Sequence, residues 1–312
     1  MLSIADQVIT DRLILAPLAG YSDLPFRLLC REFGAGLCVS EMISSHGLVY
    51  RQDRTLAMLA SIEEERPVSF QIFGADPSIM AEAAAIVGEY SPDFIDINMG
   101  CPVKKVTKRG AGAALMTDID LAEKIVRKTV ANSPCPVTIK IRSGPSQQSL
   151  CAEEYALMAE ANGVSAIAVH GRTWKQGFSG RADWQIVKTV KEAVSIPVLG
   201  NGDINSYKQA LDRISSSGCD GVMIGRAAIG NPWVFSRAGR PEFLESIVPT
   251  VIRHLHLIEE ITDHPARGLG AIKNHLGRYF KGYSGCSAIR RRLYEISDWN
   301  ELKAFTVSLA QS

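Results

Sequence analysis

Short apolar runs alternate with amphipathic helical segments from the start of the chain to about residue 240. Eight of these runs have the length of a strand: Leu13–Pro17, Leu37–Glu41, Val68–Phe73, Phe94–Asn98, Val137–Ile141, Ala166–His170, Pro197–Asn201 and Gly221–Gly225. Helical spacing of apolar residues marks segments between them: Ile79–Tyr90, Leu121–Ala131, Ala152–Ala161, Trp184–Ala193 and Tyr207–Ile214. This alternation indicates a parallel sheet covered by helices, and eight strands favour closure into a (β/α)8 TIM barrel, an α/β fold. A doubly wound open sheet is the alternative architecture.

The pattern changes after Pro241, where the strand-like runs stop. Three helical segments follow: Ile247–Ile261, Arg267–Tyr279 and Ala288–Ile296. We therefore predict a barrel over residues 1–240, followed by a small C-terminal all-helical domain over residues 241–312.

Basic residues gather in two stretches of the chain. Between residues 267 and 292 there are seven basic residues and no acidic one: Arg267, Lys273, Arg278, Lys281, Arg290, Arg291 and Arg292. A solvated helical face explains this run as well as a nucleic-acid surface does. A second cluster consists of Lys104, Lys105, Lys108 and Arg109. The pair of clusters favours a nucleic-acid backbone as partner, because phosphates are bound by gathered Lys and Arg side chains.

The overall composition excludes some classes of protein. Lys and Arg (34) nearly balance Asp and Glu (33), so the net charge indicates no partner. The seven cysteines are scattered and never spaced as Cys-x-x-Cys, which argues for a reducing compartment and against a disulfide framework or a zinc site. We find no signal peptide and no apolar run of about 18 residues. We expect a cytoplasmic protein without a metal or a membrane contact, and a monomer.

Polar residues recur where the predicted strands end. They are Glu41, Gln71, Asn98 with Cys101, Lys140 with Arg142, His170, Asn201-Gly202-Asp203 and Gly225-Arg226. In a TIM barrel the carboxyl ends of all strands meet at one face, and that face carries the active site. The recurrence therefore predicts a functional site built from these residues.

The segment around Cys101 combines a thiol with a basic loop. The run Asp96-Ile97-Asn98-Met99-Gly100-Cys101-Pro102 ends a strand in a lone cysteine, and the basic cluster follows directly. A thiol placed there can donate or accept a proton. The basic loop beside it suits a polyanionic substrate.

Other strand ends indicate an anion site and a flat ligand. Glycine turns at Gly200–Asp203 and Gly225–Arg226 follow the last two strands, where barrels often bind phosphate, although plain tight turns are the alternative. Lys140 lies in an otherwise apolar strand, where its ammonium could stabilise an anion, form a Schiff base or adjoin an electron-rich cofactor. The amides of Gln71 and Asn98 offer donors and acceptors that suit the edge of a flat heterocycle. The alternative is that they are core amides whose hydrogen bonds are made within the protein. His170 suits a phosphate or a proton shuttle.

Two other chemistries lack their sequence signals. There is no His-x-x-x-His pair and no clustered cysteine–histidine set, so a metal site is not expected. There is no Gly-x-Ser-x-Gly nucleophile elbow, which argues against Ser-His-Asp hydrolysis.

The motifs at the strand ends match one family in order and spacing over nearly the whole chain. They are Ala16-Pro17-Leu18-Ala19-Gly20-Tyr21-Ser22-Asp23, Ser40-Glu41-Met42, Gln71-Ile72-Phe73-Gly74, Asn98-Met99-Gly100-Cys101-Pro102, Lys140-Ile141-Arg142, His170-Gly171-Arg172-Thr173, Asn201-Gly202-Asp203-Ile204 and Gly225-Arg226-Ala227. With these motifs the chain resembles the bacterial tRNA-dihydrouridine synthases, and among them the B-type branch. The connection Tyr283-Ser284-Gly285-Cys286-Ser287 departs from the family pattern, and Cys286 has no evident role.

The resemblance implies an FMN-binding barrel followed by a helical tRNA-binding domain. It places the main chain of Ala16, Pro17 and Leu18 against the isoalloxazine, with Gln71 and Lys140 at its polar edge. The ribityl phosphate would be held by the remaining cofactor residues: His170, Asn201, Gly202, Asp203, Gly225 and Arg226. NADPH would reduce the flavin, and NADP would leave before tRNA enters.

The resemblance also implies the reaction. A hydride passes from flavin N5 to C6 of a D-loop uridine, and Cys101 donates a proton to C5. Asn98 and Arg142 would bind the uracil. The phosphates of the tRNA D-arm and elbow would be bound by basic residues of both clusters: Lys104, Lys105, Lys108, Arg109, Lys273, Arg278, Arg290 and Arg291. The sequence does not indicate which uridine is reduced.

Two alternatives stay open at this point. A small-molecule FMN barrel reductase, similar to dihydroorotate dehydrogenase or old yellow enzyme, shares the phosphate loops and the strand lysine but gives no reason for the basic helical domain. A non-catalytic tRNA-binding protein would keep the basic surface, but it would not need Cys101, Lys140 and Gln71 together.

Overall fold

Eight parallel strands form a closed ring. The computed structural model describes residues 1–262 and 264–309, and of Arg267 the backbone alone. The ring consists of β3 (Leu13–Leu15), β4 (Leu37–Val39), β6 (Val68–Phe73), β7 (Phe94–Asn98), β8 (Val137–Arg142), β9 (Ala166–His170), β10 (Val198–Asn201) and β11 (Gly221–Ile224). Each strand pairs with the next in the order given; β11 pairs with β3, and the β4–β6 pairing completes the ring. The predicted TIM barrel is confirmed, with all eight strands at their expected places.

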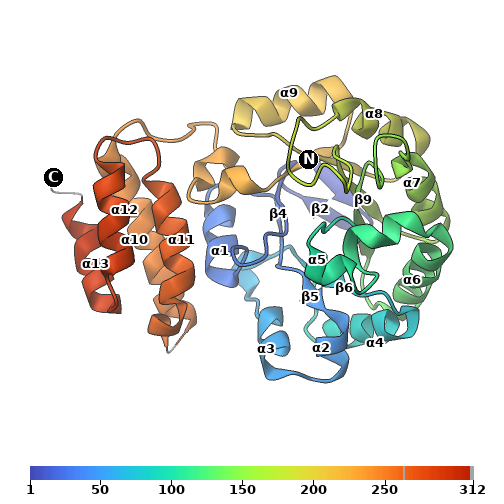
Figure 1. Ribbon diagram of the computed structural model, residues 1–312, viewed down its shortest axis with the longest axis horizontal. Helices are drawn as coiled ribbons and strands as arrows, with labels where there is room; N and C mark the ends of the chain where they lie inside the picture. The colour runs from blue at the N-terminus through green and yellow to red at the C-terminus, as the bar shows by residue number, and fades with distance from the viewer. Residues whose placement is uncertain (263, 310–312) are drawn as a thin grey trace.

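Helices surround this ring (Figure 1). They are α1 (Leu24–Glu32), α2 (Ser45–Val49), α3 (Asp53–Leu56), α4 (Pro77–Gly88), α5 (Lys104–Thr107), α6 (Ile119–Asn132), α7 (Ala152–Ala161), α8 (Trp184–Ala193) and α9 (Tyr207–Ser217). Short 3-10 turns and a two-residue strand complete the barrel: η1 (Ala57–Leu59), η2 (Glu63–Glu65), η3 (Gly112–Thr117), η4 (Arg226–Ala228), η5 (Pro232–Phe235) and β5 (Ile43–Ser44). Side chains that accept hydrogen bonds from first-turn N–H groups fix where several helices begin: Asp23, Asp76, Asp118, Asp183 and Ser206.

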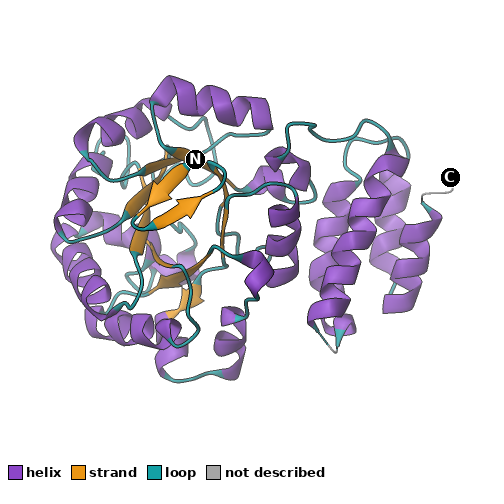
Figure 2. Cartoon of the chain, turned by 180° about the vertical axis from the view of Figure 1, so that it is seen from behind, coloured by secondary structure: helices purple, strands orange, loops and turns teal. Residues whose placement is uncertain are grey.

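A hairpin that the sequence reading missed covers the amino-terminal end of the barrel. It pairs β1 (Leu2–Ile4) with β2 (Gln7–Ile9), and it lies across the strand ring in Figure 2. Its buried side chains pack in one apolar cluster with residues from the starts of the barrel strands, among them Leu37, Phe94 and Ala166. The opposite, carboxyl-terminal end is therefore the one left for a site.

The interior of the barrel changes from apolar to polar along the strands. Side chains two residues apart on a strand share a face, so Asp96 and Asn98 point the same way as the interior residue Phe94. Cross-strand pairing extends this polar face, since Asp96 lies beside Thr138 and Asn98 beside Lys140. The sequence thus fills the amino-terminal half of the barrel with apolar side chains and its carboxyl-terminal half with groups capable of chemistry.

Among the described residues after 240, the regular elements are all helices (Figure 1). They are α10 (Leu244–Ile261), η6 (Pro265–Gly268), α11 (Leu269–Tyr279), α12 (Cys286–Glu295) and α13 (Trp299–Ser308). The three predicted helices are confirmed, and α13 was missed. Its start is marked by Asp298, whose side chain accepts from the N–H of Glu301. Within residues 1–262 and 264–309, no helix has the length and apolarity that crossing a membrane requires.

Helix α1 of the barrel shares an apolar core with the C-terminal helices. Leu24, Leu28 and Leu29 belong to the same buried cluster as Val251 of α10 and Leu276 of α11. In Figure 1, α1 lies on the side of the barrel that faces α10 and α11. The division at residue 240 stays a proposal, because the helical region completes its core with a barrel helix.

Candidate active site

The predicted site residues converge at the carboxyl-terminal end of the barrel. Gln71, Asn98, Arg142, His170 and Asn201 are buried there, each on a different strand. Parallel pairing places neighbours at one level, as with Arg142 beside His170 and Asn201 beside His170. The structure therefore joins residues that are up to 130 positions apart, the difference between 201 and 71, in a single polar layer.

Lys140 is a partly buried cation held by an amide. Its Nζ donates to Asn201 Oδ1 at 3.0 Å, and Asn201 Nδ2 donates to the carbonyl of Met223 at 2.8 Å, which fixes the orientation of the amide. Burial, with the nearby charge of Arg142, lowers the pKa of Lys140 to about 8, although Asp96 acts in the opposite direction. The ammonium is thus charged at neutral pH, and it would be stabilised further by any anion bound beside it.

Cys101 lies on a loop whose backbone is held on both sides. Its N–H donates to Asn98 Oδ1 at 2.9 Å, and its carbonyl accepts from the N–H of Ala113 at 3.0 Å. Burial raises the pKa of the thiol, while Val103 N–H, Arg142 and Lys140 act to lower it. The side chain is half-buried and stays protonated at neutral pH, so it can serve as a proton donor.

Gln71 uses both ends of its amide inside the barrel. Its Nε2 donates to Asp96 Oδ2 at 2.7 Å, and its Oε1 accepts from Asn98 Nδ2 at 2.7 Å. Asp96 was not predicted as a site residue. It is 1% exposed and also accepts a hydrogen bond from Thr138.

The two glycine turns form a cradle of backbone N–H groups. Within the described residues, the N–H groups of Gly202, Asp203, Gly225 and Arg226 have no protein acceptor. A Cβ at Gly202 would lie 2.5 Å from Ala182 Cβ, and the φ of this residue is +128°, so only glycine fits. These four N–H donors at the ends of β10 and β11 support the predicted phosphate site.

Positive charge surrounds this cradle. Arg172, a residue that sequence reasoning did not assign to the site, is 2% exposed and pairs with Asp203 at 2.6 Å. Burial and the cations Lys140, Arg142, Arg172 and Arg226 together hold the pKa of His170 far below its usual range. The signal for Arg172 was its place two residues after His170 at a strand end. His170 is therefore uncharged, and the four cations around it make this part of the site positive. Such a site suits a ligand group with two negative charges.

The turn after β3 supplies an apolar wall. The N–H of Ala16 donates to the carbonyl of Ile224 at 3.0 Å, and Leu18 closes a turn by accepting from the N–H groups of Tyr21 and Ser22. Leu18 and Ala16 lie within 3.7 Å of where a Cβ on Gly225 would be. The residues expected beside a flat ring and those expected beside a phosphate are therefore adjacent.

An exposed aromatic side chain, also unassigned from the sequence, lies near the site. Phe178 is 54% exposed, and the guanidinium groups of Arg142 and Arg226 lie 5.7 and 5.0 Å from its ring centroid. Arg142 itself donates to the carbonyls of Gly100, Thr173 and Gly177, and it thereby ties the Cys101 loop to the loop that carries Phe178.

The predicted RNA-binding residues fall into two groups. Seven are exposed and make no salt bridge within the described residues: Lys104, Lys105, Lys108, Arg109, Arg278, Arg290 and Arg291. Lys273 differs, because its ammonium donates to the carbonyl of Ile296 at the end of α12. Arg292 is paired with Glu295 and Glu301. The side chain of Arg267 lies outside the described part of the chain.

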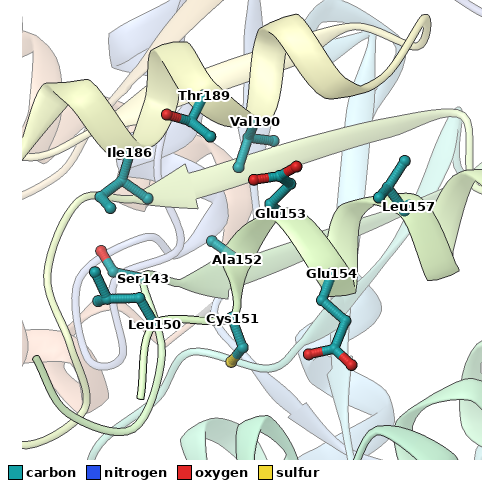
Figure 3. A pocket seen from close by; sticks show the side chains of 10 residues that line it. All are labelled: Ser143, Leu150, Cys151, Ala152, Glu153, Glu154, Leu157, Ile186, Thr189 and Val190. Atoms are coloured by element: carbon teal, nitrogen blue, oxygen red, sulfur yellow. The ribbon is translucent and has the colours of Figure 1, made fainter. Parts of the chain in front are cut away.

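A separate pocket of about 460 Å³ lies between α7 and α8. Figure 3 shows Ile186, Thr189 and Val190 of α8 on one side of it and residues of α7 on the other. Burial and the charge of Glu154 raise the pKa of the Cys151 thiol in this pocket to about 11, which makes the thiol unreactive. None of the predicted site residues lines the pocket.

Comparison with known proteins identifies the family. The family model described as dihydrouridine synthase (Dus) matches residues 14–312. The chain is 39% identical over 299 residues to tRNA-dihydrouridine synthase B of Escherichia coli strain K12, covering 93% of each chain. It is 37% identical over 308 residues to a probable tRNA-dihydrouridine synthase of Rickettsia bellii, covering 96% of this chain and 94% of the relative.

Solved structures share the fold at low identity. Histamine dehydrogenase from Rhizobium sp. 4-9 matches with a TM-score of 0.59 at 14% identity, over 100% of this chain and 64% of that one. An old yellow enzyme homologue from Zymomonas mobilis matches with a TM-score of 0.52 at 13% identity, over 73% of this chain and 88% of that one. The family model and the relatives confirm the predicted resemblance: the chain belongs to the dihydrouridine synthase family of oxidoreductases.

Proposed function

We propose that the protein reduces the C5=C6 bond of a uridine in the D-arm region of tRNA, with bound FMN and with NADPH as the electron donor. The curated relatives named tRNA-dihydrouridine synthase support tRNA as substrate. The observation that carries the proposal is the meeting of a protonated thiol, Cys101, with a cationic anion cradle at one end of the barrel.

The residues at this end fit FMN. Four backbone N–H donors without protein acceptors in the described residues suit its phosphate, as do Arg226 and the neutral His170. The apolar turn formed by Ala16, Pro17 and Leu18 suits the ring. Lys140 supplies a cation for the polar edge of the ring, where negative charge gathers. When bound, FMN supplies the hydride for C6 of the uracil.

Gln71 has less hydrogen-bonding capacity left for the cofactor than the resemblance implies. Both ends of its amide have partners in the barrel. We propose that it meets the cofactor through a second lone pair on Oε1, since an amide oxygen can accept two hydrogen bonds.

Cys101 acts as the general acid. Its Sγ–H donates a proton to C5 of the uracil, and the thiolate left behind is stabilised by Arg142 and Lys140. A positioned general acid contributes typically ~10²–10⁴ in rate. Asn98 and Arg142 bind the uracil. The second N–H of Asn98 makes only a long contact with Met42 Sδ, at 3.9 Å, which the uracil can replace, and Arg142 Nη2 has no hydrogen-bond partner in the described residues.

The exposed basic residues bind the tRNA backbone. A uridine inside folded tRNA must leave its stack, which costs on the order of a few kcal/mol. Phosphate contacts from Lys104, Lys105 and Arg109 near the site, and from Arg290 and Arg291 on α12, offset this cost. Because tRNA is the substrate, we place the activity in the cytoplasm, and we propose a monomer.

The test is to incubate the flavin-loaded protein with NADPH and unmodified tRNA and to map dihydrouridine. We expect dihydrouridine at a D-arm position. If the protein oxidises NADPH but leaves tRNA unchanged, it is a small-molecule barrel reductase. If it binds tRNA without flavin and without reduction, it is a binding protein.

A further inference from the structure

A chain of hydrogen bonds connects the barrel core to the backbone of the Cys101 loop. Asp96 Oδ2 accepts from Gln71 Nε2 at 2.7 Å, and Gln71 Oε1 accepts from Asn98 Nδ2 at 2.7 Å. Asn98 Oδ1 in turn accepts from the N–H groups of Gly100 and Cys101 at 3.1 and 2.9 Å. Two strand-end amides thus link a buried carboxylate to the loop of the proton donor.

The direction of this chain is set at Asp96. Burial raises the pKa of Asp96, while the hydrogen bonds from Thr138 and Gln71 and the charge of Lys140 favour its ionised form. In that form the carboxylate has acceptors only, whereas each primary amide has a donor end and an acceptor end. Asp96 therefore turns the NH₂ end of Gln71 toward itself and leaves the oxygen of Gln71 for Asn98. Asn98 must then present its own oxygen to the loop. An amide facing the other way at any step would set donor against donor.

The carboxylate is itself held firmly. Its other oxygen, Oδ1, accepts from Thr138 Oγ1 at 2.6 Å, and the residue is 1% exposed. Gln71, Asp96 and Thr138 are paired neighbours on three adjacent strands, so they form one level of the barrel interior. A buried charge at a level where aliphatic side chains would suffice needs a reason beyond packing.

We propose that Asp96 is a positioning residue for Cys101: it fixes the orientation of the Gln71 and Asn98 amides, and through them it holds the backbone of the loop that carries the thiol. This inference rests on the proposed function in one respect, since it takes Cys101 to be the proton donor. Asp96 touches neither the thiol nor the substrate and acts through the two amides.

The test uses substitutions that reverse the polarity and then restore it. Asp96→Asn leaves one acceptor oxygen for two donors, Gln71 Nε2 and Thr138 Oγ1, and sets an NH₂ group against one of them, which weakens the hold on Gln71 and loosens the loop. The double variant Asp96→Asn/Gln71→Glu moves the carboxylate one step along the chain, where it accepts from the amide introduced at position 96 and from Asn98. Ile97→Val is the matched control, because Ile97 is buried beside Asp96 in sequence but faces the surrounding helices.

Hydrogen–deuterium exchange of the peptide around Gly100 and Cys101, in the flavin-loaded protein, is the readout. We expect exchange to be faster by about five-fold in Asp96→Asn, the size of one broken hydrogen bond. In the double variant and in Ile97→Val it should stay within about two-fold of wild type. The rate of Cys101 alkylation, measured by peptide mass spectrometry, should follow the same order.

Two outcomes overturn the proposal: unchanged loop exchange in a folded Asp96→Asn, or a double variant that does not restore it. If Asp96→Asn does not fold, recovery of folding and loop protection in the double variant supports the proposal, and its absence overturns it. Because exchange does not depend on tRNA, failure of the proposed activity remains distinguishable. The exchange rates of the Cys101 loop in the variants test the positioning role of Asp96 even in a protein that makes no dihydrouridine.

Discussion

The mouth of the barrel and the surface of the C-terminal helices use polar residues in opposite ways. At the mouth, Lys140, Asn98 and Arg142 are bonded to neighbours from other strands and loops. On α12, Arg290 and Arg291 are exposed without a salt bridge in the described residues. Buried polar groups need fixed partners, whereas exposed charges act through their number and position. The mouth therefore suits chemistry, and we propose that the helical surface binds a polyanion.

The largest expected effect is on chemistry at the mouth. Cys101→Ala should lower the rate of dihydrouridine formation by about 10²–10⁴-fold, the usual contribution of a general acid. Flavin content and tRNA affinity should stay near wild type. The rate is measured by mapping dihydrouridine over time. Cys286→Ala, at a half-buried cysteine of the helical region, is the control and should be fully active. Equal activity of Cys101→Ala and wild type would remove the thiol from the mechanism.

The burial of Lys140 should make the free energy of unfolding depend on pH. Its pKa is lowered from 10.5 to about 8, so between these values the unfolded chain binds one more proton than the folded protein. Raising the pH through this window therefore stabilises the folded state. Relative to Lys140→Met, the flavin-free wild type should gain about 3 kcal/mol between pH 8 and 10.5. Urea unfolding of both proteins across this range measures the difference, and parallel curves would contradict the burial of a charged lysine.

The phosphate cradle should tolerate no side chain at Gly202. Gly202→Ala should lower the free energy of unfolding by about 1–3 kcal/mol and weaken flavin retention, because backbone strain and the contact with Ala182 combine there. Gly177→Ala is the matched control: its φ is also positive, at +59°, but no atom lies within 4 Å of the added Cβ. Thermal unfolding and flavin absorbance measure both. Similar losses in the two variants would show that backbone strain alone acts.

The smallest effects are expected on the helical surface. Arg290→Ala/Arg291→Ala should weaken tRNA binding several-fold and reduce the slope of its salt dependence by about one for each phosphate that is no longer neutralised. Arg292→Ala is the control, because Arg292 already pairs with Glu295 and Glu301. Filter binding at several salt concentrations measures this. Equal effects of all three arginines would argue against a localised RNA surface.

The sequence was informative where structure depends on local patterns. The eight barrel strands were readable because each is an apolar run of several residues between polar turns. The β1–β2 hairpin was missed because its three-residue strands contain the polar residues Ser3 and Gln7, whereas the equally short strands β3 and β4 are apolar throughout. Helix α13 was missed although Asp298, Trp299 and Leu302 carry a capping and apolar pattern.

Partnerships between distant residues were not readable from the sequence. Asp96 was visible only as the first residue of the motif that ends in Cys101 and Pro102, and its bond to Gln71 depends on pairing across 25 positions. Arg172 was visible in a motif, yet its pairing with Asp203 depends on two loops meeting. Lys273 looked like an RNA contact, and only the arrangement of α11 and α12 shows that its ammonium caps a helix.

The most direct measurement is a single turnover that separates chemistry from binding. The flavin-loaded protein is reduced with NADPH, freed of excess donor and mixed with unmodified tRNA without oxygen, while flavin oxidation and dihydrouridine are followed together. We predict that wild type forms one dihydrouridine per flavin oxidised. Cys101→Ala should bind tRNA but keep its flavin reduced, and Arg290→Ala/Arg291→Ala should react normally at saturating tRNA. Flavin oxidation by tRNA at the wild-type rate in Cys101→Ala, or no dihydrouridine in wild type, would contradict the account.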